Sequence, residues 1–327
     1  LQGLVAEAVR HGAIALGKLP ILQTTAGRCL EPLCKIYNLR RHASSGLRAT
    51  RSTMNLIALA ALTDNYIWIL EDTLSAWVVD PGDAVPVLEH LDRHGLVLGG
   101  ILVTHHHADH VGGINALCKA RASDAPLLCL PAADGVPQAA YAAWAPERVR
   151  LVQEGDVMTF PGFQARVLDV PGHTAGHVAY VCTFDAPASR TAVPVLFCGD
   201  TLFSAGCGRL FEGTAAQMLA SLQKLAALPP DTRVCPAHEY TLANLRFARV
   251  VEPGNPLLLA HAQTCEALRA RGLPTLPSTV SLERAINPFL RTGEPEVLLS
   301  IQRHAHAPGA QRPDEVFAAL RAWKDHF

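Results

Sequence analysis

The sequence is poor in charge and lacks several features that would point to particular protein classes. Only 17% of its 327 residues are charged, against about a quarter in an average protein, and 49% are hydrophobic. A disordered chain is therefore excluded and a sizeable core is expected. The net charge of −1 gives no basic excess for nucleic acid or for an anionic membrane surface. No uncharged apolar run of about 18 residues predicts a membrane-spanning helix.

The cysteines also lack the pattern of a disulfide framework. There are nine, an odd number, and no C-x-x-C pair occurs. Cys29 and Cys34 lie close together, but no second pair completes a zinc-binding set. We therefore expect buried or free thiols in a reducing compartment, and a cytoplasmic location.

Residues 1–53 differ in charge from the rest of the chain. They contain eight Lys or Arg and two acidic residues, a net charge of +6, whereas the remainder carries −7. The first methionine is Met54, where strand-like patterning begins. We predict that residues 1–53 are a basic extension, dispensable or disordered. The alternatives are a folded element and a transit segment, which would place the protein in the mitochondrial matrix.

From Met54 to residue 240, apolar runs alternate with turn signals, which predicts a mixed domain of strands and helices. Strands are expected at 56–59, 66–70, 76–79, 100–104, 127–130, 149–152, 165–170, 178–184, 193–198 and 233–235, and helices at 84–94, 111–120 and 214–227. After residue 240 strand signals stop, and helices are expected at 241–250, 255–271, 294–304 and 312–324. The sequence therefore predicts a helical domain over residues 241–327.

The sharpest signal is the run THHHADH at residues 104–110, which ends a short apolar strand. It has too many imidazoles for a core, because each buried one needs a polar partner. Imidazole and carboxylate together suit zinc, iron or manganese. In an extended segment His105, His107 and Asp109 point to one side and His106 to the other. His110 can turn inward as the next helix begins, so we predict a metal site.

Three further polar residues follow strands in the same way. His173 comes after 165–170, Asp200 after 193–198 and His238 after 233–235. A loop at a strand end can direct such a side chain toward a common site. With the histidine run, they complete seven ligands, enough for two metal ions.

This ligand set, from His105 to His238, resembles that of the metallo-β-lactamase superfamily over residues 54–240. The resemblance implies an α+β fold: an αββα sandwich with the metals at one edge between two sheets, followed here by the C-terminal all-helical domain. It leaves the chemistry open, because lactonases, nucleases, thioesterases, lactamases and sulfur dioxygenases share the fold.

Shorter motifs narrow the resemblance to the hydroxyacylglutathione hydrolase (glyoxalase II) family over residues 54–327. They are Asp64-Asn65-Tyr66, GDTLF at 199–203, GCGRLFEG at 206–213, HEYT at 238–241, NPF at 287–289 and RAWKD at 321–325. The family resemblance implies hydrolysis of S-D-lactoylglutathione to D-lactate and glutathione, the second step of methylglyoxal removal. The partner would be this small glutathione thioester, with no nucleic acid or membrane, and a monomer is expected.

The resemblance also assigns roles to the ligands. One metal would be held by His105, His107 and His173, and the other by Asp109, His110 and His238. Asp200 would bridge them beside a shared water or hydroxide. Two divalent ions about 3.5–4 Å apart acidify such a water and polarise a thioester carbonyl. Zinc is the first expectation for both ions, with iron and manganese as alternatives, and Asp109 would also act catalytically by orienting the hydroxide.

The same resemblance implies that five residues bind the glutathione moiety: Arg209, Phe211, Tyr240, Arg321 and Lys324. Arg321 and Lys324 are three residues apart and share one helical face, where two cations suit carboxylates. His106, His177 and Glu239 are expected to support the site or to be exposed, and Cys207 and Cys235 to pack.

Three alternative functions remain open. A lactonase or β-lactamase of the same fold would not need the cationic helical tail. A persulfide dioxygenase with one iron would leave Asp109, His110 and His238 without a metal. A metal-binding module without catalysis would be expected to lack a ligand, and none is missing.

Overall fold

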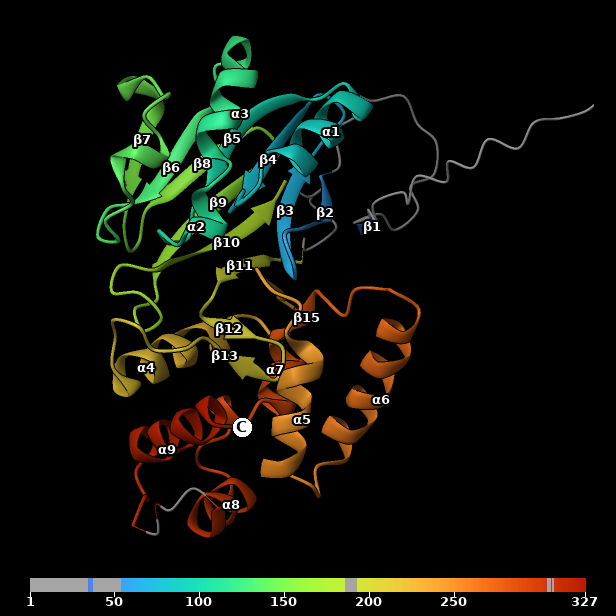
Figure 1. Ribbon diagram of the computed structural model, residues 1–327, viewed down its shortest axis with the longest axis vertical. Helices are drawn as coiled ribbons and strands as arrows, with labels where there is room; N and C mark the ends of the chain where they lie inside the picture. The colour runs from blue at the N-terminus through green and yellow to red at the C-terminus, as the bar shows by residue number, and fades with distance from the viewer. Residues whose placement is uncertain (1–34, 38–53, 186–192, 305–306, 308) are drawn as a thin grey trace, which may run out of the picture. The chain divides into compact units, whose positions relative to one another are not determined.

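The chain folds into two main sheets in the computed structural model, which describes residues 35–37, 54–185, 193–304, 307 and 309–327 (Figure 1). The first sheet has seven strands in chain order: β1 (Lys35–Tyr37), β2 (Asn55–Ala61), β3 (Asn65–Glu71), β4 (Ser75–Val79), β5 (Val97–Leu102), β6 (Leu127–Pro131) and β7 (Val149–Val152). Neighbours are antiparallel as far as β4 and parallel from β4 to β7.

The second sheet has six strands in the order β15 (Ser278–Thr279), β14 (Arg233–Pro236), β11 (Val195–Gly199), β10 (Val178–Phe184), β9 (Phe163–Asp169) and β8 (Val157–Phe160). All neighbours are antiparallel except β11 and β14. The short hairpin of β12 (Leu202–Phe203) and β13 (Gly206–Cys207) follows β11.

Alternate residues along the strands face opposite sides of each sheet, and both sides are buried. Trp68, Tyr180 and Phe197 belong to the apolar cluster that both sheets share. On the other side of the first sheet, Ile69 packs with residues of α1 (Val85–His94) and α3 (Ile114–Ala120). On the other side of the second sheet, Leu196 packs with α4 (Ala215–Ala226) and with tail helices. The predicted αββα sandwich is therefore confirmed.

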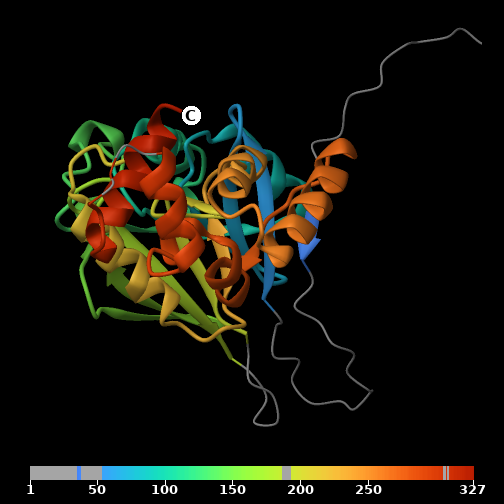
Figure 2. The same ribbon diagram turned by 90° about the horizontal axis from the view of Figure 1, so that it is seen from below.

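The predicted helical tail is confirmed as well. It consists of α5 (Thr241–Val251), α6 (Pro256–Ala270), α7 (Val280–Ile286), the short 3₁₀ helix η4 (Pro288–Leu290), α8 (Pro295–His304) and α9 (Pro313–Asp325). Phe317 and Leu320 of α9 join the apolar cluster of α4. Figure 2, seen from below, shows these orange and red helices in front of the strands.

Several short elements were not predicted. The statement that strands stop after residue 240 is wrong for β15, which has only two polar residues and pairs with β14. The helix α7 and the strand β8 were also missed. β8 has four residues and joins β9 through a tight turn at Gly162, whose φ is +85°. Three further 3₁₀ turns are η1 (Ala122–Asp124), η2 (Gln138–Ala140) and η3 (Pro146–Arg148).

The single helix predicted over 111–120 is wrong, because two helices occupy this region. They are α2 (Ala108–Val111) and α3, separated by Gly112 and Gly113. Both glycines lie against the backbone of the loop after β4. A Cβ on Gly112 would lie 2.7 Å from the Gly82 carbonyl oxygen, and one on Gly113 would lie 2.6 Å from that of Pro81. The close approach brings the first turn of α2 next to the end of β4.

Most of residues 1–53 lie outside the described ranges, so the predicted extension stays a prediction. Within it, β1 pairs antiparallel with β2 and adds an edge strand to the first sheet. Cys29 and Cys34 also lie outside the described residues. In the described part of the chain, every helix is too short or too polar to span a bilayer.

Candidate metal centre

The seven predicted ligands lie in four segments, each of which follows a strand. His105 and His107 follow β5 and lead into α2, which carries Asp109 and His110. The others come after β9, β11 and β14, and they are His173, Asp200 and His238. The expectation that Asp109 belongs to an extended segment is wrong, because Asp109 lies in the one-turn helix α2. Its carboxylate nevertheless points to the same site.

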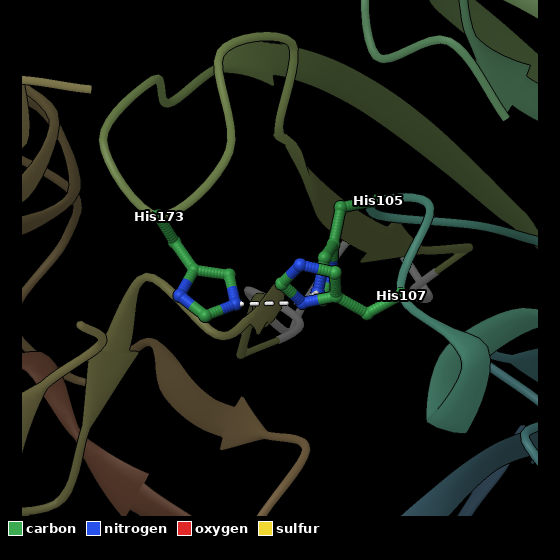
Figure 3. A group of neighbouring side chains, drawn as sticks. All are labelled: His105, His107 and His173. Carbon is green, nitrogen blue, oxygen red and sulfur yellow. Dashed lines mark hydrogen bonds between the residues drawn. The ribbon is translucent and has the colours of Figure 1, made fainter. Parts of the chain in front are cut away.

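Three imidazoles form the first ligand group, shown in Figure 3. Nδ1 of His107 lies 3.0 Å from Nε2 of His105 and 3.1 Å from Nε2 of His173. His105 is completely buried, and His173 is nearly so. The loops after β5 and β9 therefore bring three nitrogens of opposite sheets to one point.

The second ligand group contains a carboxylate and two imidazoles. Oδ2 of Asp109 lies 3.3 Å from Nε2 of His238 and 3.6 Å from Nε2 of His110. Asn65 donates a hydrogen bond of 3.1 Å to the same Asp109 oxygen. This contact holds the carboxylate toward the two rings.

Asp200 lies between the two groups. Its Oδ2 is 3.4 Å from Nε2 of His173 in the first group. Its Oδ1 is 3.5 Å from Nε2 of His110 and 3.4 Å from Nε2 of His238 in the second. One carboxylate thus directs one oxygen to each group, which is the arrangement expected of a bridging ligand.

In four of the five ligand histidines, Nδ1 lies beside an oxygen atom of the protein. Nδ1 of His173 donates to the carbonyl of Arg209 at 2.9 Å, and Nδ1 of His238 donates to Asp64 at 2.8 Å. Nδ1 of His105 lies 3.1 Å from the Thr104 hydroxyl, and Nδ1 of His110 lies 3.0 Å from Asp80. These oxygens are suited to accept the Nδ1 proton of a neutral ring, which would leave the Nε2 lone pair free for a metal ion.

The pKa values of the ligands reflect their burial and the charges of the neighbouring ligands. Burial and the neighbouring imidazoles lower the pKa of His105 well below its ordinary value, so this ring is neutral. Burial opposes ionisation of Asp200, but His110 and His238 hold its pKa well below the usual range. Burial likewise opposes charge on His238, yet the nearby carboxylates of Asp109 and Asp200 raise its pKa to about 11, so this ring carries a proton that it would release when a metal binds. Neutral imidazoles and ionised carboxylates are the forms that bind metal.

Two buried atoms support this assignment. Within the described residues, Nε2 of His110 and Oδ1 of Asp200 are buried without a hydrogen bond. A buried polar atom without a partner is costly, and a cation between the groups would satisfy both. The His and Asp residues therefore form a site for divalent metal.

Sequence reasoning missed three supporting carboxylates. Asp80, at the end of β4, accepts hydrogen bonds of 2.7 Å from both the backbone and the hydroxyl of Thr104 and also lies beside His110. Asp134 accepts from Nδ1 of His106 at 2.9 Å. Asp64 was noted only as part of a family motif. Asp64 follows β2 and lies beside His238, and its position at a strand end, like that of Asp80, was a usable signal.

The residues expected to support the site behave in different ways. His106 turns away from the ligands toward Asp134, as its alternation predicted. His177 accepts a hydrogen bond of 3.2 Å from the backbone N–H of Asp200, and its ring stacks on His105 with centroids 4.6 Å apart. Glu239 accepts from Tyr66 and from Thr275. It thus joins the tail to the sandwich.

Two predicted substrate-binding residues lie beside the ligands. The Phe211 ring, 62% exposed, meets His107 and His173 edge-on at centroid distances of 5.6 and 5.2 Å. The Tyr240 ring stacks on His238 at 4.6 Å with an interplanar angle of 3°. Each ring thus packs on a different ligand group, and both rings are exposed in part.

The predicted cationic residues have unequal surroundings. Arg209 is exposed, and its Nε lies 3.7 Å from Asp325. Arg321 is 4% exposed and already donates to the Cys207 carbonyl at 3.0 Å and to Asp325 at 2.8 Å. Nζ of Lys324 lies 5.3 Å from the Phe247 ring, and burial together with Arg321 lowers its pKa to about 8. Their contacts with substrate stay predictions.

The seven described cysteines are free and buried. Burial raises the pKa of Cys235 well above its usual value, so this thiol is not a nucleophile. Cys207 and Cys235 occupy apolar clusters, in agreement with the packing role expected for them.

Comparisons with known proteins agree with this geometry. The family model "Metallo-beta-lactamase superfamily" matches residues 62–238, and the model "Hydroxyacylglutathione hydrolase C-terminus" matches residues 239–327. A hydroxyacylglutathione hydrolase of Cupriavidus taiwanensis is 52% identical over 275 residues, which cover 82% of this chain and 97% of the relative. One from Albidiferax ferrireducens is 52% identical over 274 residues, covering 84% of this chain and all of the relative. A metallo-β-lactamase from Staphylococcus aureus shares the fold, with a TM-score of 0.51, 20% identity, and coverage of 80% of this chain and 69% of that one.

Proposed function

This chain belongs to the hydroxyacylglutathione hydrolase family, a group of thioester hydrolases in the metallo-β-lactamase superfamily, and from that premise we propose its substrate. The protein hydrolyses S-D-lactoylglutathione to D-lactate and glutathione, the second step of methylglyoxal detoxification. The proposal rests on the complete set of seven ligands, with Asp200 between the two groups. The helical tail that follows them in the sequence matches the family's C-terminal model.

The ligand atoms suit two divalent ions. His105, His107 and His173 would hold one ion, Asp109, His110 and His238 would hold the other, and Asp200 would serve both. Zinc fits this mixture of imidazole and carboxylate, as do iron and manganese. When bound, two such ions supply Lewis acidity, which polarises the thioester carbonyl and makes a water molecule nucleophilic at neutral pH.

The protein's own groups direct the water and the leaving group. Asp109 is partly exposed and ionised, so its carboxylate accepts a hydrogen bond from the attacking water and orients it. The water oxygen forms a bond to the acyl carbon, and the carbon–sulfur bond breaks. Glutathione leaves as a thiolate and then takes up a proton, so a strong general acid is not required.

The glutathione moiety lies along the rim formed by Phe211 and Tyr240, whose rings pack on the ligand imidazoles. Arg209 and Lys324 supply cationic donors for its carboxylates. Arg321 stays in the proposed binding set. Because its guanidinium already bonds to Cys207 and Asp325, a substrate carboxylate would have to share or replace the Asp325 contact.

The proposal includes the domain organisation. Residues 54–240 form the catalytic domain, 241–327 form the glutathione-recognition domain, and 1–53 are dispensable. The enzyme acts as a monomer in the cytoplasm, or in the mitochondrial matrix if residues 1–53 form a transit segment.

A direct assay tests the proposed substrate. The purified protein, loaded with zinc, iron or manganese in turn, is given S-D-lactoylglutathione, a lactone and a β-lactam, and product release is followed. We expect the thioester to be hydrolysed with the highest kcat/KM. Faster turnover of the lactone or the β-lactam would contradict the proposal. Elemental analysis of the same samples tests the two-ion stoichiometry.

A further inference from the structure

The β12–β13 hairpin is too short to define its own shape. It consists of two two-residue strands, Leu202–Phe203 and Gly206–Cys207, and even a longer isolated hairpin is marginally stable in water. Its turn contains Ala205, whose φ of +54° is a left-handed conformation that disfavours a Cβ. Contacts from elsewhere must therefore stabilise it.

Those contacts come from the helical tail. Asn244 of α5 donates to the Ser204 carbonyl at 3.0 Å, and Glu283 of α7 accepts from the Ala205 N–H at 2.8 Å. Asn287, which follows α7, donates to the Phe203 carbonyl at 3.2 Å and to the Gly206 carbonyl at 2.9 Å. With Arg321 on the Cys207 carbonyl, each residue from 203 to 207 has a backbone group bonded to a tail side chain. Figure 1 shows β12 and β13 between the second sheet and the tail helices.

Three of the tail residues that make these bonds are buried, so their side chains are not available to solvent. Glu283 and Asn287 are completely buried, and Asn244 is 2% exposed. Asn287 also donates to Glu283 at 3.2 Å, so the two side chains act as one unit. Asn287 is the first residue of the NPF motif, to which the proposed chemistry gives no role.

The hairpin in turn contacts two metal ligands. Leu202 is two residues after Asp200, and the Gly208 N–H that follows β13 donates to the Thr201 carbonyl at 3.2 Å. Gly208 is pressed so closely against Asp200 that a Cβ there would lie 1.9 Å from the Asp200 carbonyl oxygen. The next residue, Arg209, provides the carbonyl that accepts from His173.

We propose that Glu283 and Asn287 of the helical tail are positioning residues for the metal centre: they hold the β12–β13 hairpin, which places Asp200 and the Arg209 carbonyl. The tail thereby helps to build the site itself, in addition to its proposed role in binding glutathione. This inference rests on the proposed metal ligands and deepens their assignment.

Zinc affinity of the full-length apoprotein, measured by titration against a chromophoric chelator, tests the proposal. Asn287→Ala and Glu283→Ala should each weaken zinc binding about 10-fold, the lower end of what changes around metal ligands cost. They should lower kcat and leave KM for the glutathione thioester unchanged. Glu283→Gln keeps an acceptor for the Ala205 N–H and should therefore bind zinc as tightly as the parent protein.

Asn255→Ala is the matched control. Asn255 is also a buried tail asparagine bonded to backbone groups, those of Leu257, Leu258 and Ala285, none of them in the hairpin. It should lower Tm as Asn287→Ala does and leave zinc affinity unchanged. If Asn287→Ala fails to fold, Asn244→Ala, which removes one hairpin bond, replaces it.

Two results would overturn the inference: zinc affinity unaffected by the hairpin variants despite a lower Tm, or an equal loss of affinity in Asn255→Ala. Because zinc is titrated without substrate, this outcome is independent of the proposed function. A parent protein that binds two zinc ions but leaves the thioester intact would contradict only that function.

Discussion

The two ligand groups of the metal centre differ in the residues that support them. In the first group the imidazoles of His105 and His173 bond to neutral oxygens, the Thr104 hydroxyl and a backbone carbonyl. In the second group His110 and His238 face the carboxylates of Asp80 and Asp64. A carboxylate behind an imidazole makes it a more basic ligand. The second group, which also contains Asp109, is therefore the more negative one, and charge neutralisation there should affect one ion selectively.

The largest loss of metal and activity is expected from a substitution of Asp200, because this residue contacts both ligand groups. Asp200→Ala removes the only carboxylate that contacts both groups among the described residues. We expect loss of both metals from the purified protein and a fall in kcat of more than about 100-fold, the upper end of what outer-shell changes cost. Elemental analysis and steady-state kinetics measure both quantities. Two ions per chain with full turnover would refute the bridging assignment.

Asp64→Asn should weaken metal binding at the second ligand group and leave the first group unchanged. The amide keeps a similar shape but removes the charge behind His238, so one of the two ions should bind about 10- to 100-fold more weakly. Asp72→Asn is the control, because Asp72 is a carboxylate that caps a turn through the N–H groups of Leu74 and Ser75, away from the ligands. Stepwise zinc titration distinguishes one weakened site from two. Equal weakening of both would contradict the comparison.

Substitution of Lys324 should affect substrate binding, whereas the variants above affect metal binding. Loss of a hydrogen bond to a charged group costs about 1.5–3 kcal/mol, so Lys324→Ala should raise KM for the glutathione thioester about 10- to 100-fold and change kcat much less. Burial and Arg321 lower the pKa of Lys324 to about 8. The ammonium is therefore charged below that pH and neutral above it, so KM of the parent should rise as the pH passes about 8.

The matched control is Lys224→Ala. In the parent protein the Lys224 ammonium bonds to Glu154 on the outer side of the catalytic domain. The pH dependence of KM should persist in this variant and vanish in Lys324→Ala. A fall in kcat with unchanged KM in Lys324→Ala would assign Lys324 to another step.

His106→Ala should have a small effect, because His106 faces Asp134 and Glu212 instead of a ligand group. Zinc affinity should change less than in Asp64→Asn, and both sites should remain. The chelator titration described above measures this. Loss of the first ion would mean that His106 helps to position His105 or His107 far more than its contacts suggest.

The smallest effect is expected from removal of residues 1–53, because all seven ligands lie beyond them. A chain that starts at Met54 should keep kcat within about twofold, the range of surface changes that touch no special feature. Truncation also removes β1, an edge strand of the first sheet. Purification and assay of the truncated protein check this, and an insoluble or inactive product would show that the segment belongs to the fold.

The sequence was sufficient for the sandwich, the tail and the convergence of the ligands, because strand periodicity and strand-end polar residues are local signals. It was insufficient where shape depends on partners far away in the chain. The alternation argument placed His106 correctly but misplaced Asp109, since the start of α2 depends on close packing against Gly82. Likewise, spacing alone put Arg321 and Lys324 on one face. It could not reveal that Cys207, more than a hundred residues earlier, binds Arg321.

The close contact of Gly82 with Asp109 and Gly112 also affects how variants of this chain would be interpreted. A Cβ on Gly82 would lie 1.9 Å from the Asp109 carbonyl oxygen, and one on Gly112 would meet the backbone of Gly82 in return. Backbone contacts of this kind cannot be relieved by a rotamer change. Substitution of either glycine would therefore displace the helix that carries Asp109 and His110. Such a variant would look like a metal-deficiency allele, correctable in part by added zinc, although the altered residue touches no metal.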